Sequence, residues 1–417
     1  MPAPRAMSGS DLIACEPFSP IEESTSGGGR DSANQTTPAP RLPEGYSALP
    51  MTEPAELPVL GLGAELKAGI CLYAGRSAVI NDRLGDLTDP TEYRRYVRAI
   101  DGLISSTGIQ PRVAAHDLHP SYLSSQYARG CGIRRIAVQH HHAHIAAVAA
   151  DRGVSGPLVG VCCDGVGLGT DGAAWGCEVL LCDGGQFKRF GHLEYFHLIG
   201  GDAAAIENWR PAAGLVYQAF GSDWRTYLPA NFRELSDEAI QLADRAFDDK
   251  LNTHLTSSLG RVFDGVSFLL GLSRRNETPA GAATALERAA TTQSVAPYPY
   301  ETTKIGRSVR MSVAPMIRGV VRDIQAAAPA GVVSARVHES IARMLATSAA
   351  LACEVGGTSR VVLSGGCFAN RRLLARVGER LNAQHLQVLT PRRISFGDAN
   401  IALGQAVVAA AQIRETR

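Results

Sequence analysis

Along most of the chain, apolar residues form either short runs typical of strands or a repeat of about 3.6 residues typical of helices. Three short apolar runs separated by tight turns, at residues 59–62, 70–73 and 78–80, predict three strands joined by hairpins. Helical and strand-like patterns then alternate up to Gly153, which closes the last helix of this series. We therefore expect a first lobe, residues 56–156, with the order β-β-β-α-β-α.

The same order of patterns returns after the first lobe. Three strand patterns lie within residues 157–193, and a strand, helix, strand and helix follow within residues 360–412. A helix-rich insertion at about 194–335 separates these two parts of a second lobe, residues 157–417. The sequence therefore predicts an α/β protein of two duplicated lobes, with a nucleotide in the cleft between them.

Residues 1–55 differ from the rest of the chain because they show no sustained apolar period. They contain stretches rich in serine, glycine, threonine and proline. A segment of this kind buries too little apolar surface to offset the entropy lost on ordering. We therefore expect residues 1–55 to form a flexible leader.

Composition narrows the class of protein. The 417 residues carry 41 Lys and Arg against 40 Asp and Glu, so the chain lacks the basic field that favours nucleic acid as a partner. The nine cysteines include no C-x-x-C pair, which argues against a disulfide framework or a zinc ribbon. No stretch has the pattern of a signal peptide or a membrane span, and we expect a cytoplasmic protein with no membrane partner.

Four histidines stand within five positions at a predicted junction between a strand and a helix, in the string VQHHHAH. His140 and His144 are four residues apart and therefore share one face of the helix. Two imidazoles in this arrangement can bind a divalent cation if a third ligand comes from elsewhere. The alternative, one histidine that caps the helix beside others in solvent, explains four clustered histidines less well, and we favour a metal site.

A glycine-rich hairpin loop follows the first strand of the second lobe, in the string CDGVGLGTDG. Its glycines allow backbone N–H groups to converge on phosphate oxygens, and Thr170 adds a donor. Asp164 or Asp171 could hold a water on a metal ion beside the phosphate. A plain hairpin would need one or two glycines, so we favour phosphate binding, although the sequence is not a P-loop.

Two further turns lie at predicted starts of helices. Gly365 and Gly366 stand between a strand and a helix, where an adenosine could lie against bare backbone. Asp398 precedes the last helix, and by local sequence alone it is most simply a helix cap. In two duplicated lobes, however, its turn would face the turn of His140 and His144, which makes Asp398 the natural third metal ligand.

Several long motifs, in the right order, resemble the C-terminal carbamoyltransferase module of HypF-type hydrogenase maturation proteins. The motifs are VQHHHAHIAA at 138–147, DGVGLGTDGAAWG at 164–176, GGDAAAIENWR at 200–210, SLGRVFDG at 258–265, LSGGCFAN at 363–370 and IALGQA at 401–406. The strings GLGAELK and DLHPSY extend the resemblance to most of residues 57–412. The chain is therefore identified as similar to this module.

The resemblance implies an actin-like ATPase (ASKHA) fold, related to the universal tRNA threonylcarbamoyl-transfer enzymes. It also implies a reaction in which carbamoyl-adenylate, made from carbamoyl phosphate and ATP, gives its carbamoyl group to the C-terminal cysteine thiolate of the partner HypE. That transfer is the first step toward the cyanide ligands of nickel-iron hydrogenases. No covalent intermediate on the enzyme is required.

The resemblance also implies roles for individual residues, carried over by position. The implied ligands of an iron or zinc ion are His140, His144 and Asp398. The residues implied to hold phosphate, with Mg²⁺ as a further ion there, are Asp164, Gly165, Thr170 and Asp171. The residues implied at the ribose or carbamoyl end are Gly201 and Asp202, and those at the nucleotide are Gly365, Gly366 and Asn370.

The chain departs from the family pattern in several places. Full-length members carry an acylphosphatase domain, two C-x-x-C zinc fingers and a YrdC-like adenylate-forming domain before this module. These 417 residues contain none of them, which leaves open whether the chain makes carbamoyl-adenylate or only transfers its carbamoyl group. Residues 278–281 replace the usual Tyr-Glu-Gly-Gln, and Gly397 and Ala399 replace the usual Asn and Gly beside Asp398.

Two other functions remain open at this point. An O-carbamoyltransferase acting on a small-molecule hydroxyl resembles the same module. A non-catalytic nucleotide-binding scaffold could instead dock other maturation proteins. A role in tRNA modification is less favoured because the charge is balanced and the histidine motif is of the hydrogenase type.

Overall fold

The computed structural model describes residues 42, 44–250 and 252–416. They form an α/β fold built on a four-stranded and a nine-stranded sheet. Most of the expected leader, residues 1–41, lies outside the described residues. In this part of the chain no helix is long and apolar enough to cross a membrane.

The four-stranded sheet has the order β2-β1-β3-β4, in which β1 pairs antiparallel with β2 and parallel with β3. Its strands are β1 (Ser47–Gly61), β2 (Ile70–Asn81), β3 (Val113–Asp117) and β4 (Arg134–Val138). Its connecting helices are α1 (Pro90–Thr107) and α2 (Leu123–Gly130), and α3 (His140–Asp151) follows β4. Helices thus alternate with strands after the first hairpin, as the sequence predicts.

The first hairpin differs from the sequence prediction in two ways. The apolar runs 70–73 and 78–80 belong to one strand, β2, rather than to two strands, because Gly75 takes a positive φ at a bulge and the pairing with β1 continues past it. The expectation of a flexible leader up to residue 55 is wrong for residues 47–55, which belong to β1. Prolines within this segment break the apolar pattern, and the register shifts around them let the strand continue.

The nine-stranded sheet has the path β10-β11-β7-β6-β5-β12-β13, and β8 and β9 pair beside it. Its central strands are β5 (Leu158–Leu168), β6 (Ala174–Asp183), β7 (Gln186–Leu193), β12 (Arg360–Ser364) and β13 (Gln387–Leu389). The helices that follow or connect β12 and β13 are α11 (Arg371–Asn382) and α12 (Ile401–Glu415). An antiparallel meander thus continues into two parallel strands.

The segment at about 194–335 contains strands as well as helices. The helices are α4 (Ala203–Ile206), α5 (Trp209–Phe220), α6 (Asp237–Asp248), α7 (Leu259–Leu269), α8 (Gly281–Ala289) and α9 (Ala314–Gln325), and α10 (Ala330–Gly356) follows. The strands are β8 (Phe196–Ile199), β9 (Thr253–Thr256), β10 (Glu301–Ile305) and β11 (Ser308–Ser312). Since β11 pairs with β7, the segment extends the sheet instead of standing apart from it.

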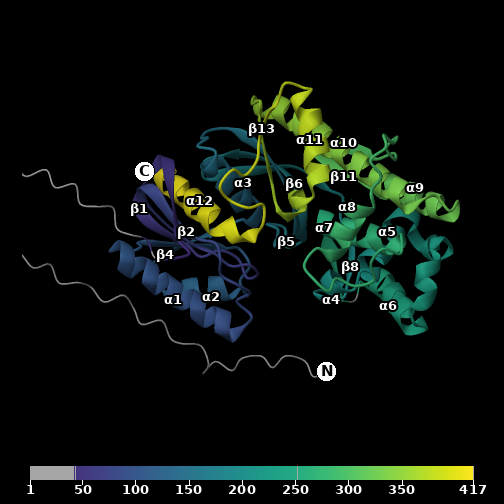
Figure 1. The fold of residues 1–417 in the computed structure, drawn as a ribbon, viewed down its shortest axis with the longest axis horizontal. Helices are drawn as coiled ribbons and strands as arrows, with labels where there is room; N and C mark the ends of the chain where they lie inside the picture. The colour runs from purple at the N-terminus through teal and green to yellow at the C-terminus, as the bar shows by residue number, and fades with distance from the viewer. Residues whose placement is uncertain (1–41, 43, 251, 417) are drawn as a thin grey trace, which may run out of the picture.

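Helices α3 and α12 cross between the two sheets. Helix α12 packs against β1 and β2 of the four-stranded sheet (Figure 1), and α3 packs against β5 and β12 of the nine-stranded sheet. A Cβ atom on Gly404 would lie 1.8 Å from the Ala143 carbonyl oxygen, so glycine is required at this crossing. The close crossing brings residues near the first turn of α3 next to the loop that leads into α12.

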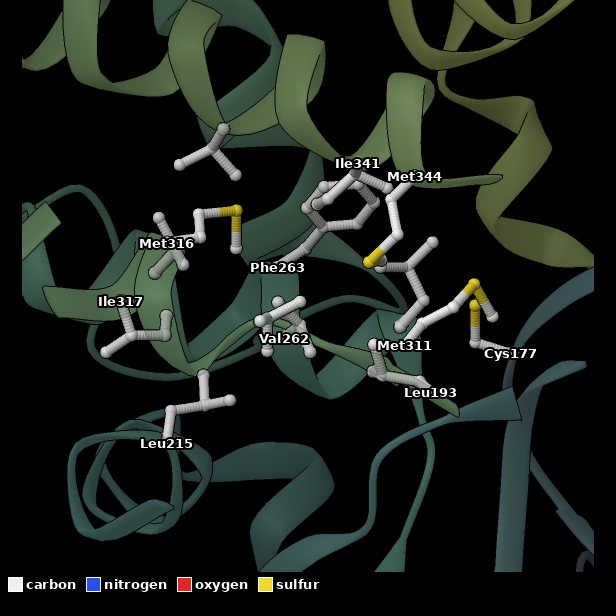
Figure 2. Close-up of a cluster of buried hydrophobic side chains, with 14 of the residues drawn as sticks. Cys177, Leu193, Leu215, Val262, Phe263, Met311, Met316, Ile317, Ile341 and Met344 are labelled. Carbon is white, nitrogen blue, oxygen red and sulfur yellow. The ribbon is translucent and has the colours of Figure 1, made fainter. Parts of the chain in front are cut away.

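A large apolar core fixes α7 to the nine-stranded sheet. Figure 2 shows Val262 and Phe263 of α7 among side chains from the sheet and from α10, including Met311 and Met344. All four side chains are buried. Burial of this kind is worth roughly 2 kcal/mol for each large apolar side chain, so the position of α7 is firmly set.

Candidate metal centre in the cleft

The histidine string folds as a capped helix start. Gln139 adopts an extended conformation at the N-cap of α3, and its side chain accepts a hydrogen bond from the His142 N–H at 2.9 Å. His140 is therefore the first residue of the helix, and His144 lies one turn further on the same face. Both imidazoles are buried.

Four side chains converge at this point from separate elements. Each of His140, His144, Asp164 and Asp398 offers one ligand atom, and these atoms lie within 4.8 Å of one another. His144 Nε2 lies 3.4 Å from Asp164 Oδ2 and 3.4 Å from Asp398 Oδ1. His140 Nε2 lies 3.4 Å from the same Asp164 oxygen and 4.0 Å from Asp398 Oδ1.

The two Nε2 atoms are the strongest sign that this cluster binds something. Both are buried, and neither has a hydrogen-bond partner among the described residues. Buried polar atoms without partners are rare because the loss of hydration costs about 1–3 kcal/mol for each. Two imidazoles and two carboxylates form a donor set that suits zinc or iron, so the residues fit the metal ion that the sequence predicts.

Asp398 is a member of the cluster and does not cap the last helix. It begins a short 3-10 turn, Asp398–Asn400, ahead of α12, and its side chain makes no capping hydrogen bond. The residue at the N-cap of α12 is Asn400. The structure thus brings together the three residues predicted as ligands, His140, His144 and Asp398.

Asp164 lies in the cluster as well, at a position where the sequence predicts contact with phosphate. One of its oxygens faces the two histidines, and the other accepts a hydrogen bond from the Gly366 N–H at 2.9 Å. Gly365 makes this approach feasible, because it has a φ of 93° and its Cβ would lie 2.4 Å from the Cys163 carbonyl oxygen. The Gly365-Gly366 turn therefore holds Asp164 in place.

Asp117 is a residue of the site that sequence reasoning did not single out. It ends β3, it is fully buried, and its Oδ2 lies 2.8 Å from His140 Nδ1. A carboxylate on the far nitrogen of a histidine ligand fixes the tautomer and the ring orientation. The DLHPSY string, which begins at Asp117, is the signal that could have found it.

The charges of the cluster shift its pKa values strongly. Burial disfavours protonated His140, but the carboxylates of Asp117, Asp164 and Asp398 raise its pKa well above the usual value. Burial also disfavours ionised Asp164, but the close approach and positive charge of His140 and His144 lower its pKa well below the usual range. The carboxylates therefore favour positive charge beside them, carried either by protonated histidines or by a metal ion.

Other predicted residues have different surroundings. Asp171 accepts hydrogen bonds from Trp175 Nε1 at 2.8 Å and from Arg189 Nη1 at 3.0 Å, and Thr170 is exposed. Asn370 is buried at the N-cap of α11, and its Nδ2 lies 2.9 Å from His338 Nε2. The structure thus gives Asp171 and Asn370 partners of their own.

The remaining predicted glycines border open space. A Cβ atom placed on Gly165 or on Gly201 would meet no heavy atom within 4 Å. Gly201 takes a positive φ of 55°, and the neighbouring Asp202 is exposed. The Cβ positions of both glycines therefore face open space.

Two sheets joined by crossing helices, with a buried polar cluster between them, define an actin-like ATPase fold with a candidate metal centre. Two family models match: the HypF Kae1-like domain over residues 54–151, and the carbamoyltransferase Kae1-like domain, second subdomain, over residues 160–405. The chain belongs to the HypF family of carbamoyltransferases.

Individual relatives agree with the family models. A carbamoyltransferase HypF homologue of Cupriavidus necator is 39% identical over 368 residues, which cover 85% of this chain and 92% of that protein. Carbamoyltransferase HypF of Rhodobacter capsulatus is 35% identical, over 89% of this chain and 48% of that protein. The chain thus spans nearly all of the first relative and about half of the second.

A solved structure shows the same fold. Full-length HypF in a phosphate- and nucleotide-bound form superposes with a TM-score of 0.83 at 31% identity, over 87% of this chain and 56% of that one. HypF of T. kodakarensis superposes with a TM-score of 0.78 at 24% identity. The actin-like fold that the sequence predicts is confirmed.

Proposed function

We propose that the chain transfers a carbamoyl group from carbamoyl-adenylate to the C-terminal cysteine thiolate of a HypE-like maturation protein. The proposal includes a nucleotide in the cleft, with carbamoyl phosphate and ATP as the cytoplasmic sources of the activated group. Membership of the HypF family supports carbamoyl transfer. The solved relative in its phosphate- and nucleotide-bound form supports the nucleotide.

The observation that carries the proposal is the buried cluster with two unpartnered Nε2 atoms. In the proposal, His140, His144, Asp164 and Asp398 hold an iron or zinc ion. When bound, such an ion supplies positive charge that stabilises negative charge on a phosphate leaving group. The open space at Gly165 is where the proposal places that phosphate.

The proposed reaction is a displacement at the carbonyl carbon. The thiolate sulfur of the acceptor attacks this carbon and forms a carbon–sulfur bond. The bond between the carbon and the phosphate oxygen breaks, and AMP leaves with the electron pair. Because carbamoyl-adenylate is already activated, the protein has mainly to position it and to exclude water.

The chain's own residues contribute orientation in this scheme. Asp117 holds His140 through Nδ1, and the Gly366 N–H holds Asp164. These contacts keep the cluster rigid, so little reorganisation is needed as charge develops on the leaving group. The thiol of the acceptor reacts after losing its proton to solvent, and the scheme needs no nucleophile from this chain.

Mass spectrometry of the acceptor tests the proposal. The purified chain is incubated with a HypE-like acceptor and either premade carbamoyl-adenylate or a mixture of ATP and carbamoyl phosphate. We expect a carbamoyl adduct on the terminal cysteine with premade carbamoyl-adenylate. An acceptor whose terminal cysteine is replaced by serine is the matched control.

The second donor mixture separates a complete enzyme from a transfer module. An adduct with ATP and carbamoyl phosphate would show that the chain also makes carbamoyl-adenylate. Transfer to small alcohols in place of the acceptor protein would identify an O-carbamoyltransferase instead. A chain that modifies neither kind of acceptor from premade carbamoyl-adenylate would refute the proposal.

A further inference from the structure

The first turn of α7 lies against the glycine-rich loop of the second lobe. Ser258 caps α7 by accepting a hydrogen bond from the Arg261 N–H at 3.1 Å, and its hydroxyl also donates to the Gly165 carbonyl oxygen. A Cβ on Gly260 would lie 3.3 Å from Gly165 Cα. The start of α7 therefore borders the open space at Gly165.

Arg261 and Asp264 form an ion pair on this helix, one turn apart. Arg261 Nη2 lies 2.7 Å from Asp264 Oδ2, and Arg261 Nη1 lies 3.4 Å from the Ala204 carbonyl oxygen. The residues are 9% and 0% exposed, so the pair is almost completely removed from bulk water. Burial of a charged pair is costly unless the remaining donors and acceptors find partners.

The remaining donors and acceptors of this pair do not find partners. Arg261 Nε makes no hydrogen bond within the described residues, and there Asp264 Oδ1 accepts none of normal geometry, while Oδ2 lies in the ion pair. Burial raises the pKa of Asp264, and Arg261 and the Asn276 amide only partly oppose this. Arg261 Nε and Asp264 Oδ1 are thus a buried donor and a buried acceptor that have no partner of normal geometry among the described residues.

The pair lies next to the cleft. The helix that carries it, α7, packs against β5, and Ser258 at its N-cap donates a hydrogen bond to the Gly165 carbonyl oxygen. Ala204, whose carbonyl oxygen faces Arg261, lies in α4, just after Gly201. The pair is thus linked to the turn at Gly165 through the start of α7 and to the turn at Gly201 through α4.

We infer that Arg261 and Asp264 recognise the carbamoyl group itself, the arginine by donating to its carbonyl oxygen and the aspartate by accepting from its NH₂ group. This inference rests on the proposed function and names the residues that select the transferred group. A carbamoyl group offers one acceptor and an amide donor close together, which matches the two unpartnered groups. An acetyl group has the same shape but offers a methyl in place of the NH₂ donor.

We expect this site to prefer a carbamoyl group strongly over an acetyl group. An acetyl group in this site would leave Asp264 Oδ1, a buried carboxylate oxygen, without a partner. Sites built to hydrogen-bond a polar group reject analogues that lack it by roughly 10⁴-fold or more. A purely structural ion pair would give no such discrimination.

The test compares kcat/KM for transfer from carbamoyl-adenylate and from acetyl-adenylate to the same acceptor. The main variant is Arg261→Met combined with Asp264→Leu, which removes both charges and leaves no unpaired ion. We expect its preference for carbamoyl over acetyl to fall at least about tenfold below that of the wild type, with AMP affinity unchanged. The matched control is Arg336→Met combined with Asp323→Leu, at a partly buried ion pair between α10 and α9.

A second variant covers the case in which the double variant does not fold. Asp264→Asn keeps the shape, but its single carbonyl oxygen can face either Arg261 or the substrate NH₂, not both. We expect the preference to fall several-fold in this variant as well. A folded variant of either kind that keeps the wild-type preference would overturn the inference.

The outcomes also separate this inference from the function on which it rests. A wild-type chain that transfers nothing from carbamoyl-adenylate defeats both. A wild-type chain that transfers carbamoyl groups while both variants keep the preference defeats the inference alone. An equal loss with both donors would also count against recognition of the carbamoyl group.

Discussion

Two buried polar clusters near the cleft differ in how completely their atoms are paired. Glu178 is fully buried and accepts hydrogen bonds from Arg189 Nε at 2.6 Å and from Ser257 Oγ at 2.5 Å. Arg189 also donates to Tyr195 at 2.7 Å, and its guanidinium carbon lies 3.8 Å from the centre of the Trp175 ring. In this cluster, which we call the Glu178 network, only Arg189 Nη2 lacks a partner within the described residues.

The candidate metal cluster of His140, His144, Asp164 and Asp398 presents the opposite case. His140 and His144 point unpartnered Nε2 atoms at two carboxylates from different elements. A cluster that served folding alone would satisfy these atoms, as the Glu178 network does. The difference indicates that the Glu178 network stabilises the fold. The unpartnered atoms of His140 and His144 lower the stability of the folded chain, and they are arranged to bind a ligand.

The largest expected effect comes from removing two ligands at once. In His140→Ala combined with Asp398→Ala, transfer from carbamoyl-adenylate should fall on the order of a thousandfold, because a catalytic metal ion contributes several kcal/mol of charge stabilisation. The melting temperature should fall far less than the activity. His142→Gln removes an imidazole from the same helix outside the cluster and is the control. Wild-type acceptor carbamoylation by the double variant would sink the metal assignment.

A large effect on stability is expected in the Glu178 network. Arg189→Met leaves the buried Glu178 carboxylate without its cation and should cost about 3–5 kcal/mol in the free energy of unfolding. Urea unfolding followed by circular dichroism measures this loss. The folded variant should still bind one metal ion per chain, and a lost ion would show that the two clusters are not independent.

A smaller effect is expected at the carboxylate behind the metal cluster. Asp117→Asn should weaken metal affinity by about 10- to 100-fold, because Asp117 orients His140 without contacting the ion. Titration against a competing chelator measures the affinity. Glu178→Gln is the matched control, since it alters a buried carboxylate of the other cluster. Equal affinities for the wild type and Asp117→Asn would remove Asp117 from the site.

The smallest expected effect is a dependence of stability on pH. Burial raises the pKa of Glu178 to about 6 from the usual value of 4.5, although Arg189 opposes the shift. Because the folded state binds the proton more tightly, this group's contribution to stability falls by about 2 kcal/mol in all as pH rises through both values, from about 3.5 to about 7. In Glu178→Gln this contribution is absent. The unfolding free energy of the wild type minus that of the variant should therefore fall over this range. A constant difference would contradict the assignment.

Local sequence predicts those parts of the site that depend on spacing within one element. His140 and His144 are four residues apart on a helix, and this spacing alone places them together. Asp398 required the duplicated order of the two lobes, because nothing near it in sequence points to a metal. The crossing of α3 and α12 at Gly404 brings the turn of Asp398 next to the turn of His140 and His144.

Other contacts depend on register and bulges that no local pattern encodes. Asp117 reaches His140 because β3 and β4 pair in parallel with Asp117 beside Val138. Asp164 turns into the cluster at an irregularity of β5 between Cys163 and Gly167. Such geometry follows from tertiary pairing, which is why local sequence does not single out Asp117 and why it indicates Asp164 beside phosphate, through a water on a metal ion, rather than as a direct ligand with His140 and His144.

The most direct test of the metal assignment is a titration of metal into the stripped chain, with carbamoyl transfer as the readout. The chain is freed of metal with a chelator, and zinc or iron is returned in steps in the presence of premade carbamoyl-adenylate and the acceptor. We predict that transfer rises in proportion to the ion added and levels off at one ion per chain. Transfer at the full rate by the metal-free chain would contradict the assignment of His140, His144, Asp164 and Asp398 as a catalytic metal centre.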